Sequence, residues 1–215
     1  MAPQVLERLR ERIVSLELPP GSLLSRGDVA AGFGVSQTPV RDALMRLEEE
    51  GLVDVFPQHK TVVSRIDIAQ ATQAHFLRRA IELEVARTLA IRGDATLVKR
   101  LRTTIARQRI ALSAGDYPEF VAGDQAFHRQ MYEAADVPGL WEDVRRRSGH
   151  IDRLRRLHLP AEGKGEAIVR DHARIVDAIA KGDAEAAQKR VRAHLSGTLA
   201  HADAIRARYP EYVAN

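Results

Sequence analysis

Four side chains in the second half of the chain have the types and spacing of a metal site. Asp124 and His128 are four residues apart, so on a helix they project from the same face. His172 and His194 lie about ten and eleven residues on either side of a Gly182-Asp183 break. If antiparallel helices meet at that break, equal rise per residue brings the two imidazoles level. One carboxylate and three imidazoles suit a divalent transition metal such as zinc or nickel, and can leave coordination positions open.

The same residues allow a plainer interpretation. An Asp-x-x-x-His pattern occurs often on helices by chance, and a single buried histidine is commonly a hydrogen-bonded core residue. His150, His158 and His201 are rival ligands that periodicity does not exclude, because His201 lies two turns beyond His194 on a similar helical face. On spacing alone, a metal site and a set of core polar residues both stay open.

A helical framework is predicted to position these residues. Strand signals disappear after Ile66, and Asp94, Asp116 and Asp183 suit the N-cap positions of helices that follow short breaks. Short connections imply antiparallel neighbours, so residues 67–215 are expected to form an all-α bundle of about six helices. The apolar periodicity places these helices at 67–92, 94–114, 117–135, 138–157, 165–181 and 183–208.

Residues 1–66 are typical of a winged helix-turn-helix. Two apolar-faced helices precede a tight turn at Gly34, and Ser36 suits the N-cap of a third helix that has Pro39 in its first turn. Two short apolar runs, 52–56 and 61–64, then predict a hairpin. The chain is therefore predicted to be mostly α, with a DNA-binding domain over residues 1–66 and a helical domain over residues 67–215.

The third helix of such a fold enters the major groove with its N-terminal residues at the base edges. Glutamine can read adenine and arginine guanine, whereas serine and threonine suit phosphates or bases. Residues 1–65 carry eight basic and nine acidic side chains, but the acidic run 48–50 lies at the far end of this helix. A merely solvated Arg41 is the plainer alternative. The predicted DNA contacts are Ser36, Gln37, Thr38, Arg41 and Arg46 on the helix, and His59 and Lys60 on the wing.

Composition narrows the classes of protein that fit. The 215 residues are 45% hydrophobic, which argues against a disordered chain. Cysteine is absent, which excludes disulfides and thiolate zinc sites and favours a reducing, cytoplasmic environment. No apolar run reaches the ~18–20 residues needed to span a bilayer, and the first residues lack the apolar stretch of a secretory signal. We therefore expect no membrane association.

The N-terminal motifs resemble those of the GntR family of bacterial transcriptional regulators. The resemblance rests on the segments 18–24, 29–30, 34–44 and 47–53. It implies a homodimer that binds a pseudo-palindromic double-stranded DNA operator. Gln37 stands where family members usually carry arginine, and Lys60 where the wing tip usually has glycine. These departures, and one near Gly27, imply an operator that differs from those of the commonest members.

The C-terminal motifs are similar to those of the FadR-like subgroup, whose ligand-binding domain is called FCD. Asp124-Gln125-Ala126-Phe127-His128 matches its D-x-x-F-H signature, and the segment from His172 to His194 matches its closing motif. In metal-dependent members these four positions bind the ion, so the resemblance implies a metal here. Arg78 resembles the arginine of the family's R-x-x-[IL]-E motif, which often points into the ligand pocket.

The ligand pocket is expected to take a small organic acid. The planar fork of Arg78 suits a carboxylate, although a plain pair with Glu82 across one helical turn fits the spacing equally well. His150 lies within an arginine-rich stretch, 145–156, and is the second predicted ligand-binding residue.

These expectations combine into a ligand-responsive transcriptional regulator, and by resemblance a repressor. Segment 61–69, from the end of the wing into the first bundle helix, is the expected point of transmission. One alternative is a metal-dependent hydrolase that uses the Asp/His3 group, although it lacks an assigned general base and leaves the winged helix unexplained. Another alternative is a DNA-binding protein that responds to no ligand. We predict a regulator and not an enzyme.

Overall fold

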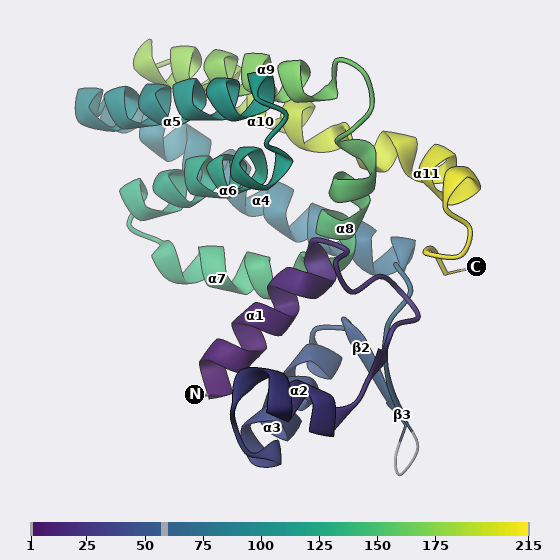
Figure 1. The fold of residues 1–215 in the computed structure, drawn as a ribbon. Helices are drawn as coiled ribbons and strands as arrows, with labels where there is room; N and C mark the ends of the chain where they lie inside the picture. The colour runs from purple at the N-terminus through teal and green to yellow at the C-terminus, as the bar shows by residue number, and fades with distance from the viewer. Residues whose placement is uncertain (1, 57–59, 215) are drawn as a thin grey trace. The chain divides into compact units, whose positions relative to one another are not determined.

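Most of the chain is helical in a computed structural model, which describes residues 2–56 and 60–214 (Figure 1). The residues fall into two compact units. Unit 1 comprises residues 1–74, 146–158 and 201–215, and unit 2 comprises residues 75–145 and 159–200. None of the described helices combines the length and the apolar character needed to cross a bilayer.

Unit 1 contains the predicted winged helix. Its helices are α1 (Ala2–Val14), α2 (Arg26–Phe33) and α3 (Gln37–Glu49), and its strands are β1 (Leu23–Leu24), β2 (Val53–Phe56) and β3 (Lys60–Val63). The strands form an antiparallel sheet in the order β1-β3-β2. The predicted hairpin is confirmed, but β1 is a strand that sequence analysis missed, because two residues are too few for a period-2 pattern.

The winged helix is held by an apolar core and by local caps. Leu9, Ile13 and Leu47 are fully buried where α1 packs against α3. Ser25 caps α2 by accepting a hydrogen bond from the backbone N–H of Asp28. Ser36 occupies the N-cap position of α3, as predicted, but its side chain makes no capping hydrogen bond. The hydroxyl of Ser36, at the start of α3, is therefore available to other partners.

Unit 1 also includes parts of the chain that sequence analysis assigned to the helical domain. These are the start of α4 (Ile68–Arg92), helix α8 (Gly149–His158) and helix α11 (Ala202–Arg208) with the residues after it. Residue Ile66 forms a parallel bridge with Val213, and α8 contacts α1 and α11. The boundary at residue 66 stays a prediction.

Unit 2 is a bundle that continues α4 and adds α5 (Ala95–Ser113), α6 (Tyr117–Ala134), α9 (Lys164–Ala180) and α10 (Ala184–Ser196). Helix α7 (Pro138–Arg147) lies mostly within the same unit. Helix α5 packs against both α6 and α9, and α9 packs against α10 (Figure 1). Asp94, Asp116 and Asp183 cap α5, α6 and α10 as predicted. The fold class is confirmed.

Two of the six predicted bundle helices are each interrupted. The helix expected at 138–157 breaks at Ser148, and α8 starts at Gly149, where a Cβ would lie 2.5 Å from Cδ2 of Leu52. The helix expected at 183–208 ends at Ser196 and resumes through a short 3₁₀ turn, η1 (Leu199–His201), into α11. The first break therefore lies next to a close contact between distant parts of the chain, which periodicity does not report.

A buried polar cluster joins α8 to the segment that links β3 to α4. Nη1 of Arg153 donates to the carbonyl of Ser64 at 2.6 Å, and the backbone N–H of Asp67 donates to Nδ1 of His150 at 3.0 Å. Ser64 Oγ donates to the carbonyl of Gly51 at 2.6 Å. Burial and the nearby Arg153 cation lower the pKa of His150 to about 4, although Asp67 opposes the shift. His150 is therefore neutral in the folded protein at pH 7.

The depressed pKa of His150 predicts acid sensitivity. Its unfolded pKa is near 6.5, so between pH 6.5 and 4 the unfolded chain binds more protons at this site, and stability falls as pH falls. At ~1.4 kcal/mol for each pKa unit, the loss is on the order of 2–3 kcal/mol. Urea denaturation with EDTA at pH 7, 6, 5 and 4 should show a shallower decline for His150→Gln than for the native protein. Parallel curves would contradict this assignment.

Candidate metal centre

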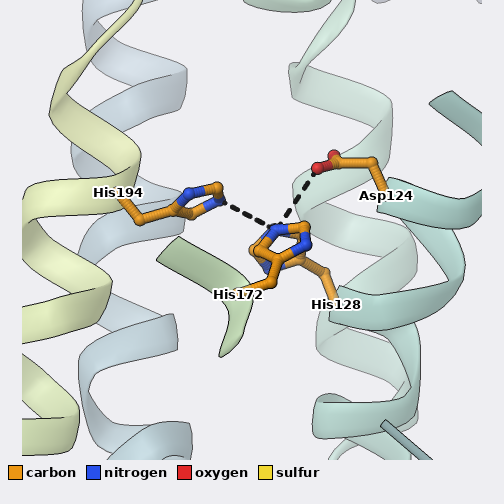
Figure 2. Close-up of side chains that lie close together, drawn as sticks. All are labelled: Asp124, His128, His172 and His194. Carbon is orange, nitrogen blue, oxygen red and sulfur yellow. Dashed lines mark hydrogen bonds and ion pairs between the residues drawn. The ribbon is translucent and has the colours of Figure 1, made fainter. Parts of the chain in front are cut away.

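The four predicted ligands come together in unit 2. Asp124 and His128 project from α6, His172 from α9 and His194 from α10, and one ligand atom from each lies within 4.8 Å of the others (Figure 2). His128 and His172 are fully buried, whereas the other two are partly buried. Sequence spacing therefore identified a real cluster.

Three separations within the cluster match those of ligands around one ion. Nε2 of His194 lies 3.3 Å from Nε2 of His172 and 3.3 Å from Nε2 of His128. Nε2 of His172 lies 3.4 Å from Oδ1 of Asp124 (Figure 2). Tetrahedral ligands at ~2.0–2.1 Å from zinc would be about 3.3–3.4 Å from one another. The donor set and these three separations fit a divalent transition metal.

Acceptors behind the rings orient the imidazoles. Nδ1 of His172 lies 2.9 Å from the amide oxygen of Gln108, on α5, and Nδ1 of His128 lies 2.9 Å from Oε2 of Glu82, on α4. Nδ1 of His194 lies 3.9 Å from Oδ2 of Asp171. The Gln108 oxygen at Nδ1 of His172 keeps the proton there and leaves the lone pair on Nε2, which is the tautomer that binds a metal. The Glu82 carboxylate favours the same tautomer of His128, whereas Asp171 lies beyond hydrogen-bond distance of His194.

Gln108 reaches His172 because a glycine faces it. Its side chain lies against Gly123 on α6, where a Cβ would come within 2.6 Å of Cγ of Gln108. A larger residue next to the ligand Asp124 would displace the amide. Phe127 stacks on His172 with ring centroids 4.0 Å apart, so a flat face of the imidazole is held as well as its Nδ1 edge.

Electrostatics keep the cluster suited to a cation. Burial lowers the pKa of His172 to about 3, so its imidazole is neutral at pH 7. Burial alone would raise the pKa of Glu82, but the Arg78 cation and His128 outweigh it and hold that pKa below its usual range. Arg78 donates to Glu82 at 2.5 Å. The site thus holds two carboxylates and one balancing arginine before any metal binds.

The rival histidines lie elsewhere. His158 and His201 belong to unit 1, where their ring centroids are 4.4 Å apart. Helix α10 ends at Ser196, so His201 does not continue the helix that carries His194 and does not share its face. Neither histidine, nor His150, is among the metal-binding candidates in the described residues.

The two predicted ligand-binding residues have protein partners. Arg78 is buried and paired with Glu82, which is the pairing that the spacing allowed, although at a buried position and not at the surface. His150 makes its contacts in unit 1, with Asp67 and Arg153. Binding of an organic acid by either residue stays a prediction.

The residues predicted to contact DNA are exposed along α3, four of them at its start and Arg46 in its last turn. Lys60 is also exposed, with Nζ 5.4 Å from the centroid of the Phe56 ring on the hairpin. His59 falls outside the described residues. At the opposite end of α3, Glu50 pairs with Arg10 of α1, so one acidic side chain is neutralised away from the proposed contacts. The predicted contacts that are exposed on α3 or at its N-cap are Ser36, Gln37, Thr38, Arg41 and Arg46.

Sequence reasoning missed the residues behind the histidines. Glu82 was noted only as a partner of Arg78, and Gln108 was not singled out at all. Their roles depend on which helix faces which, and local spacing does not encode that. Asp171 adjoins His172, but adjacency alone carries little information about a contact with His194.

A winged helix followed by a helical domain with a buried Asp/His3 group defines a two-part transcription factor. The chain belongs to the GntR family: residues 1–63 match the gntR family of bacterial regulatory proteins, and residues 73–197 match the FCD domain. These families comprise DNA-binding regulators and not enzymes, as the sequence predicted.

Relatives and solved structures agree with this assignment. An uncharacterised HTH-type transcriptional regulator from an unstable DNA locus of Streptomyces ambofaciens is 39% identical over 96% of this chain and 87% of its own length. The HTH-type transcriptional repressor RspR of Escherichia coli K12 is 32% identical over 89% of this chain and 84% of its own. The structure of E. coli McbR/YncC shares the fold, with a TM-score of 0.80 and 19% identity, over 97% of this chain and 98% of that one.

The acceptors behind the histidines predict a test of the site. Gln108→Met keeps the volume but removes the acceptor for Nδ1 of His172, so zinc affinity should fall by about 10–100-fold with one site per chain retained. Competition with a chromophoric chelator measures this. Gln130→Met is the matched control, because Gln130 also joins α6 to α5, through Thr104 at 2.9 Å, without touching the cluster. Equal affinities in the two variants would contradict the assigned role.

Proposed function

We propose that the chain is a homodimeric repressor of the FadR-like subgroup that senses a small organic acid through a metal at Asp124, His128, His172 and His194. One observation carries the proposal: a buried, metal-suited cluster with oriented imidazoles lies in the same chain as an exposed recognition helix. An operator-bound regulator works where the DNA lies, in the cytoplasm.

Zinc or nickel suits the proposed site because its donors are three imidazole nitrogens and one carboxylate oxygen. When bound, such an ion acts as a Lewis acid that can take an oxygen ligand from outside the protein. Asp124 cancels one of its two positive charges, and Glu82 is balanced by Arg78. The net positive charge that remains favours an anionic ligand, which supports a carboxylate effector.

Binding of the acid is proposed to change the affinity for DNA. Such a coupling is reciprocal, so an acid that weakens operator binding must itself be weakened by the operator. The family resemblance supports repression that the ligand relieves, and two relatives are named as repressors. In a dimer, the two DNA-reading heads would bind the two half-sites of the operator.

Arg41 tests the DNA-binding half. Arg41→Ala should weaken binding to an operator selected from a random DNA library by about 1–3 kcal/mol and relax the base preference at one position of each half-site. Fluorescence anisotropy at fixed salt measures the affinity. Arg12→Ala is the control, because Arg12 is a partly exposed arginine on α1 that pairs with Glu17. Equal affinity of Arg41→Ala and the native protein would remove this residue from the interface.

Metal analysis and a thermal-shift screen test the sensing half. We expect about one ion per chain in untagged protein, and a shift in Tm from one class of organic acid that chelation abolishes. A His172→Ala/His194→Ala double variant should lose both the ion and the metal-dependent shift while keeping operator binding. An equal shift in metal-free protein would contradict recognition through the metal.

A further inference from the structure

Arg153 is a buried cation whose hydrogen bonds, in the described part of the chain, all go to neutral groups. It is fully buried on α8 and donates to the carbonyl of Ser64 at 2.6 Å and to Oγ of Ser64 at 3.2 Å. It also lies 3.0 Å from Nδ1 of His150. Burying an arginine whose hydrogen-bond acceptors are all neutral is costly, and the attraction of the Asp54 carboxylate offsets only part of that cost, so this position demands an explanation beyond packing.

The residues around Arg153 lie at the base of both DNA-reading elements. Gly149, at the start of α8, sits so close to Leu52 that a Cβ would clash, and Leu52 follows directly on the end of α3. Ser64 follows β3, the second strand of the wing, and its hydroxyl donates to the carbonyl of Gly51. The first turns of α8 therefore hold the end of the recognition helix and the end of the wing together.

The chain leads from this cluster to the metal centre in two directions. Asp67, which donates to His150, precedes α4, and the same continuous helix carries Glu82 behind His128. On the other side, α8 is followed by residues 159–163 and then by α9, which carries His172. Both routes meet where α8 contacts the segment 64–67.

We propose that α8 is the adaptor between the metal centre and the DNA-reading elements, with Arg153 as its positioning residue. The inference rests on the proposed metal-sensing function. Arg153 clamps the backbone of segment 64–67, so metal binding that orders α4 and α9 also orders the base of the wing. Sequence analysis placed the transmission point at 61–69, and the clamp adds the partner that holds it.

Hydrogen–deuterium exchange with zinc alone tests the coupling. In native protein stripped with EDTA, one equivalent of zinc should slow exchange in α9 and also in residues 60–67, the latter by about fivefold, the lower range of allosteric coupling. In Arg153→Met, zinc should still bind and slow exchange in α9, but the effect in residues 60–67 should disappear. Arg155→Met is the matched control, because Arg155 lies on the same helix and pairs with Asp152.

A milder substitution keeps the test valid if Arg153→Met does not fold. Arg153→Lys keeps the charge but not the planar fork, so it should fold and lose at least about half of the zinc effect in residues 60–67. The proposal is overturned if zinc leaves residues 60–67 of the native protein unchanged, or if Arg153→Met and Arg153→Lys both keep the full effect. Absence of zinc binding, with no slowing in α9, would instead refute the metal site and remove the input on which the coupling depends.

Discussion

Three imidazole nitrogens that point at one another constrain the whole of unit 2. Nε2 of His194 lies 3.3 Å from Nε2 of both His128 and His172, and a side-chain oxygen lies 2.9 Å from Nδ1 of each of the latter two rings. Neutral lone pairs at that distance repel unless a cation lies between them. Burial disfavours a proton on His172, and the cluster is one that could hold a metal ion between the rings.

This constraint involves nearly every helix of the bundle. Ligands come from α6, α9 and α10, and the acceptors behind them come from α4, α5 and α9. A metal that binds here therefore joins five helices at one point, and its binding free energy adds to the stability of their packing. Under the proposed function, the site would be a structural joint as well as a sensor, because loss of the ion would release contacts on every one of these helices.

The sequence predicted what depends on local spacing and missed what depends on packing. Helical periodicity and the short break at Gly182-Asp183 sufficed to bring His172 and His194 level. The roles of Glu82 and Gln108 were not predicted, because their partners are fixed by the packing of α4 and α5 against α6 and α9. The break at Ser148 was also not predicted. It lies next to Gly149, which meets Leu52, a residue nearly a hundred positions earlier.

Each unit contains a buried arginine, Arg78 in unit 2 and Arg153 in unit 1, and the two are held by different kinds of partner. Arg78 is paired with Glu82, and breaking a buried ion pair by removing one partner costs about 3–5 kcal/mol. Arg153 is held by the carbonyls of Gly149 and Ser64, a hydroxyl and an imidazole, each worth about 1.5–3 kcal/mol to a charged donor and each replaceable by water or by another acceptor. The first arrangement resists displacement, and it stands behind a ligand whose position must not vary. The second can exchange its partners one at a time, which is the property that a joint next to the wing requires if DNA affinity is to change without unfolding.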